Sequence, residues 1–322
     1  MTDVKYPSGC RPLTEDLGTD ELIRRLKTLA HALQAMGQDE KHVPDYIQLA
    51  LMLVDEYFLQ HSSRDVQLLV ACCIADILRV FAPEAPYKDQ DQIKAIFMFF
   101  IKQLNGLKDP KDASFKRYFY LLENLAFVKS FNMCFEIEDC QKIFCQLFAM
   151  MFRIINDDHS TKVKNFMIDI MSPLITEADN LTTPLLDLIL INIVEPQKSA
   201  NIHAYHLAEQ LIQKTSYALE PIIKIFFNQV LILGKIDKNI AVTAKMYDLI
   251  YELYQISPNL MCSVLPQLEC KLKSTTEIER MKAVSLLARM FSEKDSQLSK
   301  KTYLIIANAF GSFLRHCCSD TR

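Results

Sequence analysis

The chain has 322 residues, 50% of them hydrophobic, which suffices for a globular core and excludes a disordered chain. Only 6 residues are glycine, and this scarcity argues against β-hairpins and against the glycine-rich phosphate loops of Rossmann and P-loop enzymes. The net charge is −3 at pH 7, with acids and bases mixed along the chain, so no extended positive field is expected to bind nucleic acid.

The N-terminal residues predict neither secretion nor membrane insertion. Residues 1–10 lack the apolar segment of a secretory signal peptide. The richest apolar stretch, residues 68–82, is interrupted by Asp76 and Arg79, so it falls short of the roughly 18 apolar residues of a membrane span. We interpret the 10 cysteines as reduced thiols of an intracellular protein with no membrane partner. We expect residues 1–18 to be poorly ordered.

From about residue 19 onward, apolar residues recur at helical spacing. The clearest example is residues 65–81, where the apolar positions follow one face of a helix. These positions are Val66, Leu69, Val70, Cys73, Ile77 and Phe81. Aromatic clusters at residues 96–101 and 117–131 are expected in the core between helices, where each buried ring stabilises the fold by about 1.5–3 kcal/mol.

Short polar interruptions divide this helical pattern at regular intervals. They occupy residues 61–65, 108–114, 156–162, 196–201, 234–239 and 273–279. Their spacing of about 38 to 47 residues is typical of paired antiparallel helices stacked as HEAT-type repeats. The sequence therefore predicts an all-α fold, a HEAT-repeat α-solenoid of stacked antiparallel helix pairs over residues 19–298. Gly106 and Gly234 follow helical stretches where a left-handed helix stop is expected.

The segment from Arg79 to Tyr87, with the sequence RVFAPEAPY, breaks a long helical pattern with two prolines. Pro83 cannot continue a helix. Because a residue that precedes proline favours extended backbone, Ala82 and Ala85 are expected to be non-helical, with the next helix opening near Asp89 or Asp91. Such a stiff segment has two interpretations: a simple connector, or a pre-organised ledge that presents one exposed carboxylate to a partner.

No catalytic or metal site is predicted. Cys134, Cys140 and Cys145 lack the C-x2-C spacing typical of structural zinc. His203 and His206 share a predicted helix face but have no third ligand nearby. Without a G-x-S-x-G motif or another nucleophile signature, a non-enzymatic binding scaffold without cofactors is favoured.

Basic residues gather at two of the predicted repeat turns and allow two interpretations. Stacking in register aligns them into a basic ridge, or they belong to a solvated rim of mixed charge. The residues are Lys111, Lys116, Arg117, Lys162 and Lys164.

Four long blocks of the sequence are similar to one known family. Residues 68–87, 117–136, 220–235 and 263–274 closely resemble, in the same order, the N-terminal HEAT region of the precocious-dissociation-of-sisters family of cohesin-associated proteins. The resemblance covers roughly residues 4 to 298. It implies a nuclear, chromatin-associated regulator that binds the cohesin complex, maintains sister-chromatid cohesion and helps to release cohesin.

The same resemblance implies a partner site in the proline segment. In the family, an Ala-Pro-acidic-Ala-Pro motif docks short Tyr-Ser-Arg-type segments of the cohesin-release factor and of its cohesion-protecting antagonist. Every position of the motif is present here, and we add the following tyrosine as a neighbour. The predicted peptide-binding residues are Ala82, Pro83, Glu84, Ala85, Pro86 and Tyr87. We expect Glu84 to face the arginine of the incoming segment, because such charge-assisted pairs are strong.

Residues 299–322 depart from the family pattern. Family members continue with further repeats, so the resemblance implies an N-terminal portion, apparently truncated, with an atypical C-terminal end. The family's sites for the kleisin subunit of cohesin and for an inositol polyphosphate lie later in its chain. A HEAT adaptor of nuclear transport or vesicle coats is the alternative function, and a phosphatase scaffold subunit is the third. A transport receptor is usually more acidic than this chain, and a phosphatase scaffold has repeats of more regular length.

Overall fold

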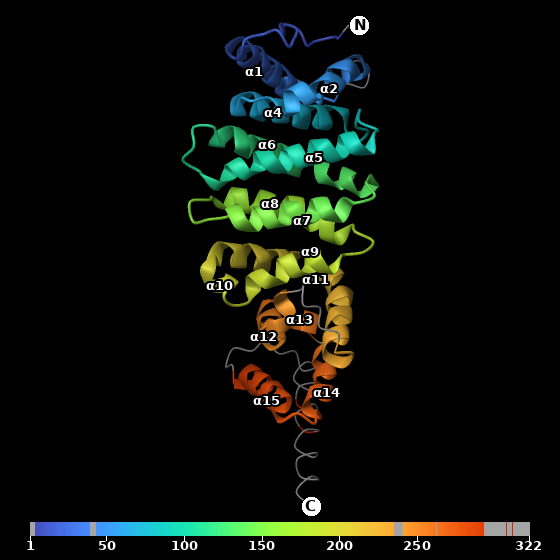
Figure 1. Ribbon diagram of the computed structural model, residues 1–322, viewed down its shortest axis with the longest axis vertical. Helices are drawn as coiled ribbons and strands as arrows, with labels where there is room; N and C mark the ends of the chain where they lie inside the picture. The colour runs from blue at the N-terminus through green and yellow to red at the C-terminus, as the bar shows by residue number, and fades with distance from the viewer. Residues whose placement is uncertain are drawn as a thin grey trace, which may run out of the picture. The chain divides into compact units, whose positions relative to one another are not determined.

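The computed structural model describes residues 4–38, 43–234, 241–261, 263–292, 307 and 311. Residue contacts divide the chain into two units, residues 1–174 and 175–322. Over the described ranges every regular element is a helix and no strand is present (Figure 1). The predicted all-α class is therefore confirmed.

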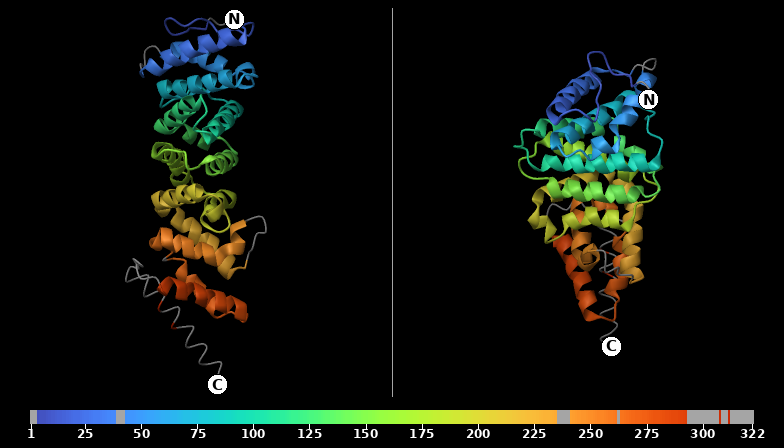
Figure 2. Two further views of the ribbon diagram at one scale, coloured as in Figure 1. Left: turned by 90° about the vertical axis from the view of Figure 1, so that its left-hand side faces the viewer. Right: turned by 45° about the horizontal axis from the view of Figure 1, so that its top comes forward.

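Unit 1 is built from helices that stack in two layers. Their bounds are α1 Thr19–Ala35, α2 Ile47–Leu53, α3 Glu56–Leu59, α4 Arg64–Phe81, α5 Gln90–Leu104, α6 Phe115–Phe127, α7 Cys140–Ile154 and α8 Thr161–Thr176, the last ending just inside unit 2. Short 3-10 helices cover Val43–Tyr46, Asn105–Lys108 and Ser130–Glu136. In one layer α1 packs on α4 and α4 on α6, and in the other α5 packs on α7, as the left view of Figure 2 shows.

Unit 2 is also helical but is built from shorter pieces. Its α-helices are α9 Thr183–Leu190, α10 Gln197–Ala200, α11 Ile202–Phe227, α12 Met246–Ile256, α13 Pro258–Met261, α14 Glu269–Leu272 and α15 Glu277–Ser292. Between them lie 3-10 helices at Ile191–Ile193, Ala241–Lys245 and Leu265–Leu268 and a π-helical turn at Asn228–Ile232. Within this unit α12 packs against α13 and α15.

Where the structure describes them, the predicted polar interruptions lie at helix starts, although residues 197–200 of one of them form the short helix α10. Each polar interruption leads into a helix of the next repeat: α4 follows residues 61–63, α6 follows 109–114, α8 follows 155–160, α11 follows 196–201 and α15 follows 273–276. Residues 235–239 of the interruption after Gly234 lie outside the described residues, as do 299–306, 308–310 and 312–322 of the C-terminal segment 299–322.

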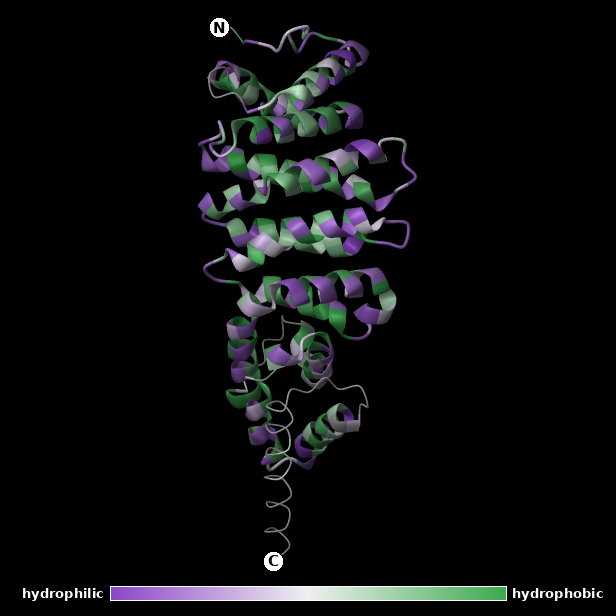
Figure 3. Ribbon diagram, turned by 180° about the vertical axis from the view of Figure 1, so that it is seen from behind, coloured by the Kyte–Doolittle hydropathy of each residue, from purple (hydrophilic) through white to green (hydrophobic). Residues whose placement is uncertain are grey.

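Helix α4 is buried more completely than its periodicity predicts. The pattern indicated one apolar face, but α4 is buried on all sides because α1 and α6 flank it and α2, α3 and α5 pack on it as well. Among its predicted core residues only Phe81, at its end, is half-buried. The other helices of unit 1 show the expected mixture of hydrophobic and hydrophilic residues (Figure 3). Helix α4 is thus the centre of the N-terminal repeats.

The N-terminal segment has defined contacts where poor order was expected. Residues 4–18 contain no helix, but the side chain of Leu13 is 5% exposed and its backbone N–H donates to the Tyr6 hydroxyl at 3.0 Å. The Arg25 guanidinium of α1 donates to the carbonyl of Pro12 at 2.5 Å. These contacts hold the segment against the first repeat because its few apolar side chains find a partner surface there.

One of the two predicted glycine stops is confirmed and the other is wrong. Gly234 has φ +62°, the left-handed conformation of a helix stop. Gly106 instead lies inside a 3-10 helix, Asn105–Lys108, and a Cβ there would come within 2.3 Å of the Tyr118 ring. Glycine is required at this position by the close approach of a buried ring rather than by the backbone angle.

A buried carboxylate and its arginine partner join three helices of unit 1: α1, α4 and α6. The carboxylate of Asp76 in α4 is fully buried and accepts hydrogen bonds from the Tyr120 hydroxyl at 2.8 Å and from Asn124 Nδ2 at 3.0 Å. Both donors belong to α6. Burial raises the pKa of Asp76, while the hydrogen bonds from Tyr120 and Arg79 oppose that rise. A buried carboxylate is tolerated in proteins only when it is satisfied in this way.

The partner of this carboxylate extends the network to α1. The Arg79 guanidinium donates to Asp76 Oδ1 at 3.0 Å and to the carbonyls of Leu33 and Met36 at 2.8 and 2.9 Å. These carbonyls lie at the C-terminal end of α1, where backbone acceptors lack helical partners and the helix dipole favours a cation. Arg79 therefore ties the end of α1 to the last turn of α4.

We predict that removing either side of this network destabilises the protein. Asp76→Ala leaves Arg79 and two buried donors without their acceptor and is expected to lower the free energy of unfolding by about 3–5 kcal/mol. Tyr120→Phe removes one donor and is expected to cost about 1.5–3 kcal/mol. Urea denaturation followed by circular dichroism measures both. Glu123→Ala, an exposed acid on α6, serves as the control, and equal stability of Asp76→Ala and this control would contradict the assignment.

We also predict that Gly106→Ala destabilises the chain by about 1–3 kcal/mol, because the new methyl group forces the buried Tyr118 ring to move. Gly37→Ala is the matched control, since no atom lies within 4 Å of a Cβ at that position. Thermal unfolding compares the two variants, and an unchanged melting temperature for Gly106→Ala would show that the ring is free to shift.

Candidate partner-docking site

The predicted docking segment is the connection between α4 and α5. Ala82 ends α4 with extended backbone, φ −54° and ψ 138°, as expected for a residue before proline. The next helix opens at Gln90, where the Asp89 carboxylate accepts from the backbone N–H of Gln92 at 2.8 Å. The predicted helix break and the predicted opening of α5 are both confirmed. We call residues 82–86 the ledge.

Exposure varies along the ledge. Pro83 and Glu84 are exposed, and Ala85 and Pro86 are half-buried. Glu84 forms no hydrogen bond or ion pair with any residue that the structure describes, so its carboxylate is available to a cation. The ledge thus presents one rigid proline ring and one unpaired negative charge.

Tyr87 differs from the other predicted site residues because it faces the core. Its side chain is 2% exposed, and its hydroxyl donates to the carbonyl of Ala50 in α2 at 3.4 Å. Burial raises the pKa of this tyrosine well above its ordinary value. Because this side chain is covered, we expect Tyr87 to anchor the ledge to the preceding repeat, and its inclusion among the peptide contacts stays a prediction.

Hydrogen bonds hold the two helix ends that flank the ledge. On one side, the Gln38 side chain, just after α1, donates to the carbonyl of Arg79 at 2.9 Å. On the other side, the Gln90 side chain donates to the carbonyl of Glu136, in the turn after α6, at 3.0 Å. Because both flanking helix ends are held in place, little ordering entropy is lost when a partner binds the short segment between them.

Sequence reasoning missed the exposure of one aromatic residue at the end of α6. Phe127, the last residue of α6, is 80% exposed, although its cluster was assigned to the core. Asp76 pairs with Asn124, and the two helices run side by side, so the end of α6 lies beside the end of α4 (Figure 1). Helical spacing was the available signal, since Phe127 falls off the face that buries Leu121 and Leu125.

The candidate metal ligands do not converge. Cys134 is buried, whereas Cys140 and Cys145 are half-buried. In unit 2, His206 contacts Glu209 at 3.1 Å. No group of three His, Cys, Asp or Glu side chains suited to a metal ion is present among the described residues, and no described helix is long and apolar enough to cross a membrane.

Comparison with known proteins shows the family. The family model described as "Sister chromatid cohesion protein PDS5 protein" matches residues 20–315. The chain belongs to the PDS5 family. The match extends past residue 298, where the resemblance was expected to end.

The chain is similar in sequence to curated PDS5 relatives over nearly its whole length. It is 49% identical to PDS5 homolog A of Mus musculus over 297 residues, which cover 92% of this chain and 22% of that protein. It is 48% identical to PDS5 homolog B-B of Xenopus laevis over 299 residues, or 92% of this chain and 20% of the relative. The chain therefore spans about a fifth of the length of these relatives.

A solved structure of a Pds5–Scc1 complex has the same fold. It matches 97% of this chain and 49% of its own chain, with a TM-score of 0.80 and 21% sequence identity. This likeness confirms the HEAT-repeat solenoid that the spacing of polar interruptions predicted. In this PDS5-family chain, the ledge is the connection between the two helices of an N-terminal repeat.

We predict that Tyr87 acts through stability rather than through partner contact. Tyr87→Ala removes a buried ring and is expected to lower the free energy of unfolding by about 3–5 kcal/mol. Tyr87→Phe keeps the ring and loses only a long hydrogen bond, so about 1 kcal/mol or less is expected. Chemical denaturation measures both variants. If Tyr87→Phe kept full stability but weakened partner binding, the anchoring role would be wrong.

Proposed function

We propose that this chain is a non-enzymatic scaffold segment of a nuclear, chromatin-associated PDS5 protein that acts with cohesin in sister-chromatid cohesion and in cohesin release. Membership of the PDS5 family is the observation that supports this proposal. The helical repeats supply extended surfaces for partners. No observation favours the alternative of a transport or vesicle-coat adaptor.

We further propose that the ledge, residues 82–86, docks short Tyr-Ser-Arg-type segments of the cohesin-release factor and of its cohesion-protecting antagonist. The unpaired, exposed carboxylate of Glu84 supports this assignment, because it accepts a charge-assisted hydrogen bond from the arginine of such a segment. The proline-stiffened ledge lies between residues that hydrogen bonds hold in place, namely Arg79, Tyr87 and Gln90, and supplies a pre-organised surface for the rest.

A short segment on this ledge forms a weak and exchangeable contact. A few residues bury well under about 1,200 Å², the lower limit of standard protein interfaces. Two antagonists can then compete for the ledge, and further contacts elsewhere on each partner supply avidity. Exchange between a releasing and a protecting partner follows from this weakness.

We predict that Glu84→Lys weakens binding of a fluorescent peptide that contains Tyr-Ser-Arg by about tenfold, equivalent to about 1.4 kcal/mol. A peptide that carries glutamate in place of the arginine is expected to bind the variant better than the original chain. Fluorescence anisotropy measures the four affinities. Glu123→Lys gives the same charge change on α6, away from the ledge. Failure of the charge-swapped peptide to recover affinity would contradict the pairing of Glu84 with arginine.

A further inference from the structure

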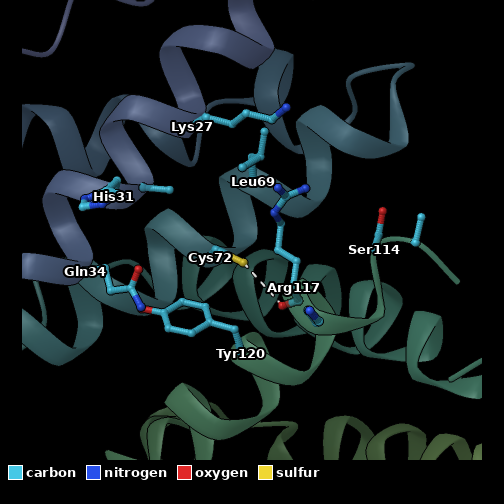
Figure 4. Close-up of a pocket in the computed structure, with 11 residues that line it drawn as sticks. Lys27, His31, Gln34, Leu69, Cys72, Ser114, Arg117 and Tyr120 are labelled. Carbon is cyan, nitrogen blue, oxygen red and sulfur yellow. Dashed lines mark hydrogen bonds between the residues drawn. The ribbon is translucent and has the colours of Figure 1, made fainter. Parts of the chain in front are cut away.

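A pocket separate from the ledge opens between α1, α4 and α6 of unit 1. Its volume is about 550 Å³, within the range of about 300–1,000 Å³ typical of ligand sites. Helix α4 supplies the floor through Leu69 and Cys72, and α1 and α6 supply the walls (Figure 4). The residues of the ledge do not line it.

The rim of this pocket is positively charged. Lys27 from α1 and Lys116 and Arg117 from α6 line it together with His31, and no carboxylate does. None of the three cations forms an ion pair with a residue that the structure describes. In a chain whose net charge is −3, three unpaired cations from two helices around one hollow form a local site for anionic groups.

Two basic residues near the pocket differ from those on its rim because they form ion pairs. Lys111, in the turn before α6, pairs with Asp158 at 3.1 Å, and Arg64 at the start of α4 pairs with Asp112 at 3.0 Å. These two cations of the same repeats are therefore neutralised by acidic partners, whereas the cations that line the pocket are not.

The floor of the pocket is apolar. Leu69 and Cys72 are each 2% exposed, and the Cys72 thiol donates to the carbonyl of Arg117 at 3.8 Å. Burial raises the pKa of this thiol to about 12, so it stays neutral and adds no negative charge. A well-matched ligand combines an apolar group at its centre with anionic groups at its edges.

The pocket is also held in shape before any ligand arrives. Tyr120 forms part of its wall, and its hydroxyl donates to the buried carboxylate of Asp76 at 2.8 Å. Gln34 lines the same end of the pocket, and its carbonyl accepts from Arg79 at 3.3 Å. The wall therefore needs little reorganisation on binding.

We propose that this pocket docks an acidic segment of a partner protein. An apolar side chain of the segment rests on Leu69 and Cys72, and flanking carboxylates pair with Lys27, Lys116 and Arg117. The ledge prefers the opposite charge, because its exposed ionic group is Glu84. The pocket is thus a second docking site, and the assignment stands whether or not the ledge binds Tyr-Ser-Arg segments.

Nucleic acid fits this pocket less well. Duplex DNA places a charge about every 1.7 Å along its axis and is bound by cations spread along that track, whereas these cations surround one hollow. Single strands stack their bases on aromatic rings, whereas this lining offers the imidazole of His31 and the ring of Tyr120, which is fixed through Asp76. The apolar floor also makes no favourable contact with a free phosphate.

The test uses the full chain and a short fluorescein-labelled peptide with glutamates on both sides of a leucine–phenylalanine pair. The double variant Lys27→Glu with Lys116→Glu reverses two exposed rim charges. The double variant Lys162→Glu with Lys164→Glu makes the same charge change on α8, outside the lining. We expect the first pair to weaken binding at least about tenfold and the second to change it less than about twofold.

Two further measurements distinguish an acidic peptide from nucleic acid or phosphate as the ligand of the pocket. A peptide with glutamines in place of the glutamates is expected to lose most of the affinity, and a DNA duplex or inorganic phosphate is expected to compete poorly with the acidic peptide. The proposal is overturned if the acidic peptide does not bind, if the two double variants bind it equally, or if DNA or phosphate displaces it at equal charge concentration. Thermal melts confirm that both double variants remain folded.

Discussion

The buried ion pair between Asp76 and Arg79 is the interaction on which the N-terminal repeats depend. A carboxylate inside a hydrophobic helix is costly unless every acceptor site is used, and here donors from α4 and α6 surround it. The guanidinium in turn binds the last carbonyls of α1. Because these hydrogen bonds have fixed lengths and directions, they set the relative register of α1, α4 and α6 where apolar packing alone would permit sliding.

The positions of both candidate binding surfaces, the ledge and the pocket, depend on that register of the helices. The ledge begins directly after the turn of α4 that carries Arg79, so its position relative to α1 is fixed by the same side chain. The pocket lies on the other side of the network. Tyr120 belongs to the pocket and to the network, because its ring forms part of the pocket wall and its hydroxyl donates to Asp76. One polar network therefore supports a ledge with an exposed acid and a pocket with a basic rim, two surfaces that select partners of opposite charge.

Local features were predicted well from the sequence, and features that need a neighbouring repeat were not. Pro83 ends α4 and Asp89 caps α5 as expected, because proline geometry and capping act within a few residues. Gly106 was misread as a helix stop, since the ring of Tyr118 that excludes a side chain there comes from the next helix. Phe127 was assigned to the core from composition, although helical spacing places it on the outer side of α6.

The sequence by itself determined the helical class, the repeat length, the helix break and the motif of the ledge, because each depends on periodicity or on residues close together in the chain. The tertiary structure alone decided that the Tyr87 side chain is buried, since its burial requires the carbonyl of Ala50 and the surface of α2. It also decided that Lys27 and Lys116, far apart in the sequence, meet around one apolar floor. Such a meeting depends on how whole helices stack, and no local pattern encodes it.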